Sequence, residues 1–180
     1  CIVGDERADV LAPELAGLPF GQGHGSCFWM KGTVDREAPG WAMDANQAMQ
    51  GHSAQDLPET QGILAGDVAL YIFTSGTTGL PKAATYKQQR LVAAANLLGS
   101  LTLRPKPGDR LYLCLPIYHI TGLGPGLCGF IAAGGTVCLR RTFSASKFWS
   151  EVQAWQTNSF VYVGELCRYL VTQAPSDAEK

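Results

Sequence analysis

A run of hydroxyl-bearing residues and glycines between Thr74 and Lys82 holds the side chains of this chain that are best suited to chemistry. The run reads Thr-Ser-Gly-Thr-Thr-Gly-Leu-Pro-Lys. Its hydroxyl groups and the Lys82 ammonium are hydrogen-bond donors, and its glycines let backbone N–H groups come close to a ligand. A run that offers many hydrogen-bond donors and few acceptors suits a polyanionic ligand, and a polyphosphate fits best. The candidate phosphate-binding residues are therefore Thr74, Ser75, Gly76, Thr77, Thr78, Gly79 and Lys82.

The segment before this run supports its placement at a ligand site. Residues 68–73 are an unbroken apolar run, which predicts a strand buried on both faces, as in a parallel sheet. Ligands of open α/β sheets bind just beyond the carboxyl ends of such strands. Pro81 precedes Lys82 and Ala83 follows it. This order argues against a Walker A loop, in which Gly-Lys-Ser/Thr opens a helix, and so against a P-loop kinase or NTPase.

A second candidate is His119, at the end of the segment Leu-Pro-Ile-Tyr-His that closes a predicted strand. On its residues alone, this histidine is either a helix-start or core residue satisfied by a hydrogen bond, or a group that faces a ligand. His24 and His52 lie in a polar region without partners, so we expect a solvated or capping role for each. No cysteine or histidine spacing predicts a metal site.

Strand and helix patterns alternate along the second two-thirds of the chain. Pro81 argues against a helix start directly after the candidate loop, and we expect an extended return over residues 82–86 instead. The further expected elements are helices at 87–101, 144–155 (with Ser144 as the cap) and 164–172, and strands at 110–115, 136–139 and 159–163. This alternation predicts an α/β fold with a mainly parallel sheet flanked by helices. Earlier in the chain we expect a strand at 1–4 and a helix at 9–18, and short elements within residues 19–66.

Composition narrows the functional classes. The 180 residues suffice for one modest domain, and a net charge of −1 gives no electrostatic case for nucleic acid or an anionic membrane. The six cysteines show no CxxC pair, so we interpret them as small core residues in a reducing, cytoplasmic compartment. Residues 122–139 carry no charged side chain, but a proline and six glycines argue against a membrane span.

The string from Tyr71 to Lys82 resembles the phosphate-binding motif of the adenylate-forming superfamily. This superfamily includes acyl-CoA synthetases, luciferases and peptide-synthetase adenylation domains, and Phe73 stands where many members carry Tyr. Residues 140–149 and 162–170 are similar to the fatty acid transport protein group of very-long-chain and long-chain acyl-CoA synthetases. The resemblance runs from about residue 67 to residue 171.

This resemblance implies a two-step reaction. The loop would grip the β- and γ-phosphates of ATP while a fatty carboxylate attacks the α-phosphate, and CoA thiol would then displace AMP. ATP, Mg²⁺ and CoA are the implied cofactors and co-substrates, and a fatty acid is the implied substrate. Lys82 and His119 are the implied catalytic residues, with His119 on the carboxylate and acyl side. There it would donate a hydrogen bond to the carboxylate or wall the acyl tunnel.

Residues 1–180 are interpreted as a partial N-terminal AMP-binding domain, without the C-terminal domain. The superfamily's later Mg²⁺-binding Glu, ribose-binding Asp and carboxylate-contacting Lys are not found in this sequence. We therefore expect the chain alone to be inactive. The full-length protein is expected in the cytoplasm, with peripheral membrane association left open. Two alternatives also remain open: a ligase for another carboxylic acid, such as an aryl or amino acid, and a nucleotide-binding module without ligase activity.

Overall fold

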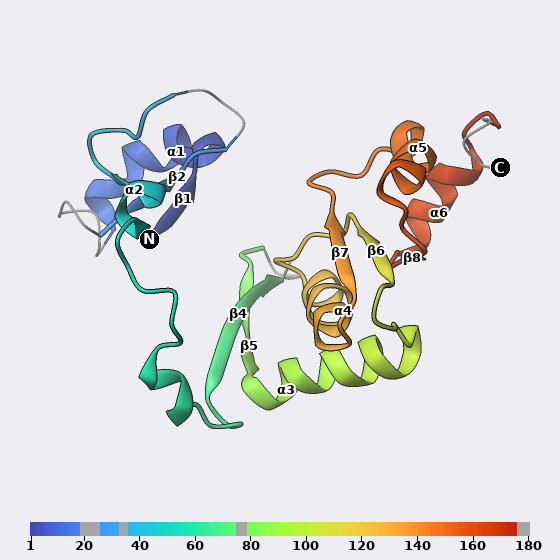
Figure 1. The fold of residues 1–180 in the computed structure, drawn as a ribbon. Coiled ribbons are helices and arrows are strands. Elements are labelled where there is room, and N and C mark those ends of the chain that lie inside the picture. Colours follow the sequence, from blue (N-terminus) through green and yellow to red (C-terminus); the bar gives the residue numbers. More distant parts are fainter. Residues whose placement is uncertain (19–25, 33–35, 75–78, 176–180) are drawn as a thin grey trace. The chain divides into compact units, whose positions relative to one another are not determined.

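The computed structural model describes residues 1–18, 26–32, 36–74 and 79–175. The chain divides into two compact units, residues 1–58 and residues 59–180 (Figure 1). Each unit has its own parallel sheet and its own buried apolar side chains. The motifs with candidate chemistry all belong to the second unit.

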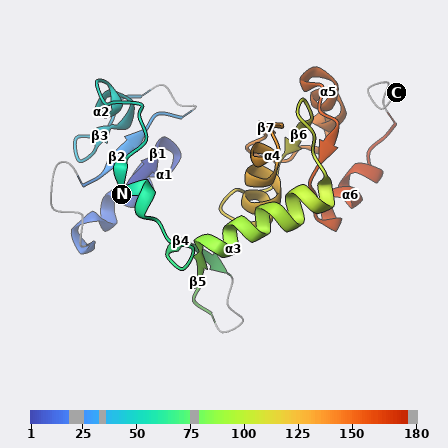
Figure 2. The ribbon, with the colours of Figure 1, turned by 60° about the horizontal axis from the view of Figure 1, so that its bottom comes forward.

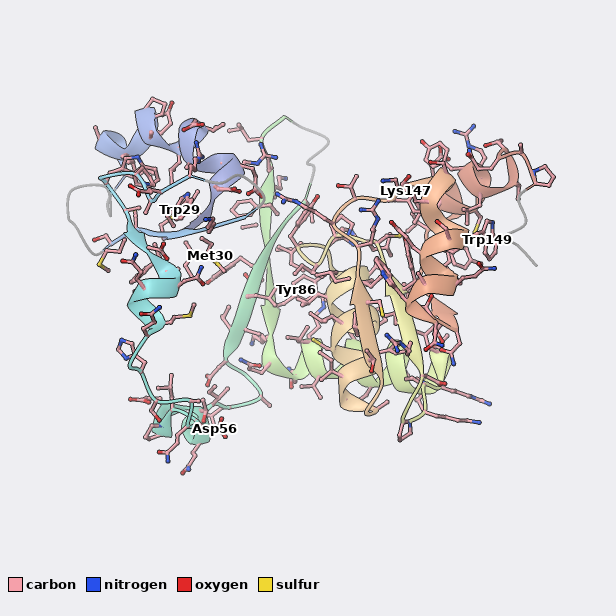
Figure 3. The ribbon with its side chains drawn as sticks, turned by 45° about the horizontal axis from the view of Figure 1, so that its top comes forward. Trp29, Met30, Asp56, Tyr86, Lys147 and Trp149 are labelled. Atoms are coloured by element: carbon pink, nitrogen blue, oxygen red, sulfur yellow. The ribbon has the colours of Figure 1, made fainter. Side chains whose placement is uncertain are left out.

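The first unit is built on a parallel sheet of three short strands in the order β1-β2-β3. Its elements are β1 (Ile2–Gly4), α1 (Asp5–Leu11), the 3₁₀ helix η1 (Ala12–Gly17), β2 (Phe28–Met30), β3 (Met43–Asp44) and α2 (Ala45–Met49). Along β2, Trp29 is buried and Met30 is exposed, as expected where successive side chains point to opposite faces (Figure 3). The predicted first strand is confirmed, and β2, β3 and α2 are among the short elements expected within residues 19–66. The predicted helix at 9–18 instead begins at Asp5 and ends as a 3₁₀ helix.

A two-stranded antiparallel hairpin opens the second unit after the 3₁₀ helix η2 (Pro58–Gly62). Its strands are β4 (Val68–Thr74) and β5 (Lys82–Lys87), so both predicted strands are present. The prediction that β4 is buried on both faces in a parallel sheet is wrong. Ile72 is buried, but Tyr71 and Phe73 are 61% and 72% exposed. An apolar run shows only that a segment is hydrophobic. The pairing is antiparallel because the chain returns immediately as β5.

One continuous helix follows the hairpin, as predicted for residues 87–101. It begins as α3 (Gln88–Ala93) and continues without interruption as the π-helical segment η3 (Ala94–Leu103) (Figure 2). The helix ends at Arg104, whose φ of 49° lies in the left-handed region. Left-handed residues commonly terminate helices because they turn the chain away from the helix axis.

A three-stranded parallel sheet in the order β7-β6-β8 forms the rest of the second unit. Its strands are β6 (Arg110–Leu113), β7 (Thr136–Leu139) and β8 (Ser159–Phe160); its helices are the π-helical η4 (Gly122–Cys128), α4 (Gly129–Ala132), α5 (Ala145–Trp155) and α6 (Gly164–Val171). Ser144 precedes α5 as predicted, although its hydroxyl contacts that of Ser146 and not a backbone N–H. The α/β fold with parallel strands and flanking helices is thereby confirmed.

The uncharged segment 122–139 forms η4, α4 and β7, with a turn between α4 and β7. Throughout the described residues, we find no helix that combines the length and the hydropathy required to cross a bilayer.

Phe130 anchors α4 on the sheet, and its truncation provides a test of this core. The side chain is fully buried with Leu111 and Leu113, whereas the neighbouring Ile131 is 60% exposed. We expect Phe130→Ala to lower the free energy of unfolding by about 3–5 kcal/mol, because it opens a cavity in a packed core. The matched control Ile131→Ala should change it by less than about 1 kcal/mol. Urea-induced unfolding of the 180-residue chain measures both values, and equal losses would contradict this assignment of the core.

Candidate functional site

The hairpin places Thr74 and Lys82 directly opposite each other at the end next to its turn. They are the last registered pair of β4 and β5, and the Thr74 hydroxyl donates to the Lys82 carbonyl oxygen at 3.3 Å. The Lys82 side chain is exposed, and its ammonium has no hydrogen bond or ion pair to any residue the structure describes. The positive charge is therefore available to a ligand beside the turn.

The turn of the hairpin carries the rest of the candidate phosphate-binding residues. Gly79 has a φ of 113°, a conformation that favours glycine, and nothing lies within 4 Å of the position of a Cβ there. The backbone at Gly79 is thus open to close approach by a ligand. Ser75, Gly76, Thr77 and Thr78 lie outside the described residues.

His119 lies in the turn after β6 and caps the helix that follows. Its Nδ1 accepts from the Thr121 N–H at 3.3 Å, and its carbonyl oxygen accepts from the Leu123 N–H at 3.0 Å. The helix-start interpretation of this residue is therefore observed. When Nδ1 of a neutral imidazole accepts a hydrogen bond, the proton resides on Nε2. The exposed ring of His119 thus presents Nε2–H as a donor.

The two candidate catalytic residues are carried by separate elements of the second unit. Lys82 is the first residue of β5, and His119 follows β6. Within the described part of the chain, no hydrogen bond joins their side chains. Their relative position must therefore be set by the elements that carry them.

A partly buried polar cluster that the sequence did not indicate holds the end of β7 to α5. The Tyr112 hydroxyl donates to Glu151 Oε2 at 2.7 Å, and Arg140 Nε donates to the same oxygen at 2.9 Å. The pKa of Tyr112 is raised, mainly by burial and to a smaller extent by the hydrogen bond to Glu151, so the phenol is a neutral donor. Nothing in the spacing of these three residues signals their contact, because they come from three separate elements.

The neighbouring Cys114 belongs to this core and not to a reactive site. Burial raises the pKa of the Cys114 thiol to about 11. The thiolate is the reactive form of cysteine, so a thiol with a raised pKa is inert at neutral pH. All six cysteines are free, as expected, but the interpretation as core residues holds only for Cys27 and Cys114: Cys1 is exposed and the other three are partly buried.

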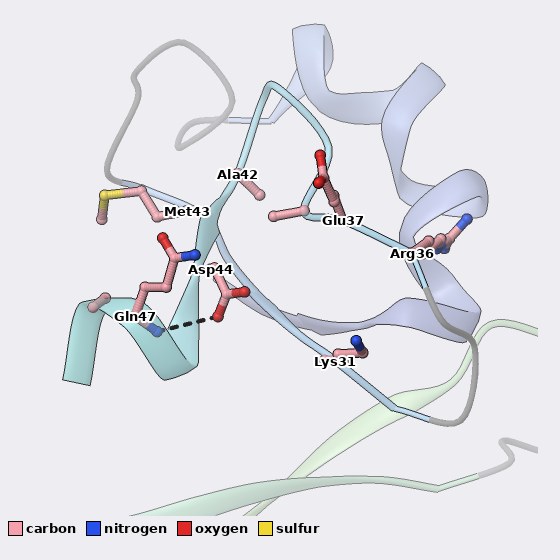
Figure 4. A pocket seen from close by; sticks show the side chains of 9 residues that line it. Lys31, Arg36, Glu37, Ala42, Met43, Asp44 and Gln47 are labelled. Carbon is pink, nitrogen blue, oxygen red and sulfur yellow. Dashed lines mark hydrogen bonds between the residues drawn. The ribbon is translucent and has the colours of Figure 1, made fainter. Parts of the chain in front are cut away.

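The first unit contains a hollow of about 730 Å³ that holds none of the predicted site residues (Figure 4). It is lined by Lys31, Arg36, Glu37, Ala38, Ala42, Met43, Asp44, Gln47 and Ala48. Arg36 donates to the Asp9 carboxylate and to the Asp5 carbonyl oxygen. Asp44 caps α2 by accepting from the backbone N–H groups of residues 46 and 47. Because these groups already serve the fold, we place the candidate site at the hairpin and not in this hollow.

An exposed lysine at a glycine- and hydroxyl-rich turn, within an α/β fold, is an arrangement that suits a phosphate ligand. The chain belongs to the AMP-binding enzyme family, whose family model matches residues 29–180. The superfamily resemblance seen in the sequence is thereby confirmed.

Relatives and solved structures agree with this assignment. The chain is 38% identical over 181 aligned positions to long-chain fatty acid transport protein 3 of Homo sapiens, covering 97% of this chain and 26% of that protein. It is 45% identical over 118 residues to the medium/long-chain-fatty-acid–CoA ligase FadD6 of Mycobacterium tuberculosis, covering 66% of this chain and 20% of the ligase. The chain therefore spans about a quarter or less of these relatives. ATP-bound MatB from Rhodopseudomonas palustris matches the fold with a TM-score of 0.71 at 23% identity, over 96% of this chain and 31% of MatB.

The tautomer of His119 can be measured directly. We expect nitrogen NMR of the ¹⁵N-labelled chain to show an unprotonated Nδ1 and a protonated Nε2 in the neutral ring, because the Thr121 N–H occupies Nδ1. The control is His52, an exposed histidine whose ring has no hydrogen bond to the described residues; it should show the tautomer mixture of free histidine. A proton found on Nδ1 of His119 would rule out the cap.

Proposed function

We propose that this chain is part of the N-terminal AMP-binding domain of a long-chain or very-long-chain fatty acyl-CoA synthetase. The observation that carries the proposal is the Lys82 ammonium at the turn end of the hairpin, which has no partner among the described residues. The similarity to a fatty acid transport protein and to a fatty-acid–CoA ligase supports a fatty acid as the substrate. The full-length protein would act in the cytoplasm.

The proposed reaction begins with attack of the fatty carboxylate on the α-phosphate of ATP, which gives acyl-adenylate and pyrophosphate. CoA thiol then displaces AMP and forms the thioester. The chain contributes little covalent chemistry to this reaction. It orients an in-line displacement and stabilises the charge that develops on the leaving pyrophosphate.

Lys82 is suited to that stabilising role. Its ammonium is a compact charge with three donors, and it has no partner among the described residues that would have to be displaced. The Thr74 hydroxyl, in contrast, already donates within the hairpin, so it must rotate to bind a phosphate oxygen. Gly79 and residues 75–78 complete the proposed phosphate loop.

Mg²⁺ would supply charge neutralisation at the phosphates when bound. In the described ranges, no group of three or more His, Cys, Asp or Glu residues lies close enough to hold a metal ion. We therefore assign no residue of this chain to the metal.

His119 is proposed as a hydrogen-bond donor on the carboxylate side. A fatty carboxylate is already ionised at neutral pH, so it needs no general base. The cap on Nδ1 leaves Nε2–H to donate to a carboxylate oxygen, or leaves the ring to line the acyl site. Either contact would affect binding of the fatty acid more than binding of ATP.

Removal of the Lys82 ammonium tests the phosphate site. In the full-length protein, Lys82→Ala should lower fatty-acid-dependent ATP–pyrophosphate exchange by about 10²-fold or more, by analogy with the loss of one transition-state donor. Lys87→Ala is the matched control, because Lys87 is exposed at the other end of the same strand. It should leave the exchange rate within about twofold of the wild type. Equal rates for wild type and Lys82→Ala would remove Lys82 from the site.

Substitution of His119 tests the side of the site on which it acts. We expect His119→Ala in the full-length protein to raise KM for the fatty acid more than KM for ATP. Separate titrations of the two substrates measure both constants, and the exposed His52 supplies the control variant His52→Ala. A shift confined to the ATP dependence would show that His119 is not on the carboxylate side.

A further inference from the structure

The helix that continues from the hairpin packs backbone against backbone on the helix that begins after His119. A Cβ added to Gly99 of η3 would lie 2.6 Å from the Cα of Gly129, and a Cβ added to Gly129 would lie 2.7 Å from the Cα of Gly99. Distances below about 3 Å leave no space for a side chain on either residue. The two helices can approach this closely only because both positions are glycine.

The close contact extends along both helices. A Cβ on Gly124 would lie 3.0 Å from the Cβ of Ala94, and one on Gly129 would lie 2.9 Å from the Ala95 carbonyl oxygen. We call these five residues (Ala94, Ala95, Gly99, Gly124 and Gly129) the glycine seam. Four of them belong to the π-helical segments η3 and η4, and π-helical winding is frequent at functional sites.

The first helix continues directly from β5 and is hydrogen-bonded to the segment that leads into β4. The Gln88 N–H donates to the Asp67 carbonyl oxygen at 2.9 Å, and the Gln89 N–H donates to the Ala65 carbonyl oxygen at 3.0 Å. The guanidinium of Arg90 lies over the Tyr86 ring, 4.5 Å from its centroid. Hairpin and helix therefore shift together.

The second helix is equally joined to the turn that carries His119. The Leu123 N–H donates to the His119 carbonyl oxygen, and Gly122 lies so close to Pro116 that an added Cβ would be 2.4 Å from its carbonyl oxygen. The ring of His119 is itself held by the Thr121 N–H. A displacement of this helix would therefore carry His119 with it.

We propose that Gly99, Gly124 and Gly129 are positioning residues that set the distance and orientation of the Lys82 hairpin relative to His119. The inference rests on the proposed function, in which the hairpin holds the phosphates of ATP and His119 lies on the carboxylate side. In-line attack requires the two reacting atoms at about 3–3.5 Å, and a displacement of about 1 Å can cost 10²-fold in rate. The glycine seam couples the two groups without contacting either substrate.

The test adds a methyl group at one contact of the glycine seam and then removes the methyl group that opposes it. In the full-length protein, Gly124→Ala should lower kcat for fatty-acid-dependent pyrophosphate exchange by about tenfold, with each KM within about twofold of the wild type. Adding Ala94→Gly removes the opposing Cβ and should restore kcat to within about threefold of the wild type. The control is Gly17→Ala in η1, where nothing lies within 4 Å of the added Cβ; its kcat should be unchanged.

The rescue separates positioning from stability. Relief of the overpacked contact stabilises the double variant whereas a second helical glycine destabilises it, so every rate is measured well below the melting temperature of its variant. An unchanged kcat in folded Gly124→Ala overturns the inference, as does a kcat that Ala94→Gly fails to restore. If Gly124→Ala yields no folded protein, Ala94→Ser enlarges the same contact from the other helix and should give the same fall in kcat.

Failure of the proposed function has a different signature. Wild-type exchange that depends on another carboxylic acid would correct the substrate, and the same variants would then be compared with that acid. Absence of exchange with every acid tested would overturn the proposed function and this inference with it.

Discussion

The second unit depends on the burial of β6 on both faces. Leu111 and Leu113 point to one face and pack with Phe130 of α4, while Tyr112 points to the other and packs against Phe148 of α5, with ring centroids 5.0 Å apart. Each fully buried apolar side chain contributes roughly 1.5–3 kcal/mol. β7 and β8 both pair with β6, which is the central strand of the sheet. The helices that pack on this sheet are therefore positioned by that one strand.

The polar cluster on the α5 side of β6 fixes the orientation of α5 on the sheet. Apolar contacts hold α5 against the sheet without selecting one orientation, whereas the single Glu151 oxygen accepts from both Tyr112 and Arg140. Removal of one member of such a partly buried set leaves another polar group without its partner, which is costly. The cluster thus fixes where β7 ends relative to α5.

The same arrangement explains how a site can be built from weakly connected parts. His119 follows the buried strand β6 and is therefore tied to the sheet, while Lys82 is on a hairpin outside it. The helix from Gln88 to Leu103 links the hairpin to the sheet. Where this helix crosses the helix after His119, the two backbones are in direct contact and no side chains lie between them. Such contacts tolerate little change, because each backbone is a rigid neighbour.

The sequence by itself determined the order and type of most elements in the second unit and the donor groups of the candidate loop. These features depend on neighbouring residues: the alternation of strand and helix patterns, and the donors gathered before Lys82. Even the helix-start role of His119 was open to such reasoning, although the nitrogen that accepts the Thr121 N–H was not.

Only the tertiary structure decided which segments meet. The apolar run of β4 could not show that β5 would pair with it antiparallel and leave Phe73 exposed. Tyr112 and Glu151 are 39 residues apart, and no local pattern relates them. The contact between Gly99 and Gly129 is equally invisible in the sequence, because a glycine that permits close approach looks the same as one in open space. Local preferences act between sequence neighbours, whereas these contacts arise from the packing of elements that are distant along the chain.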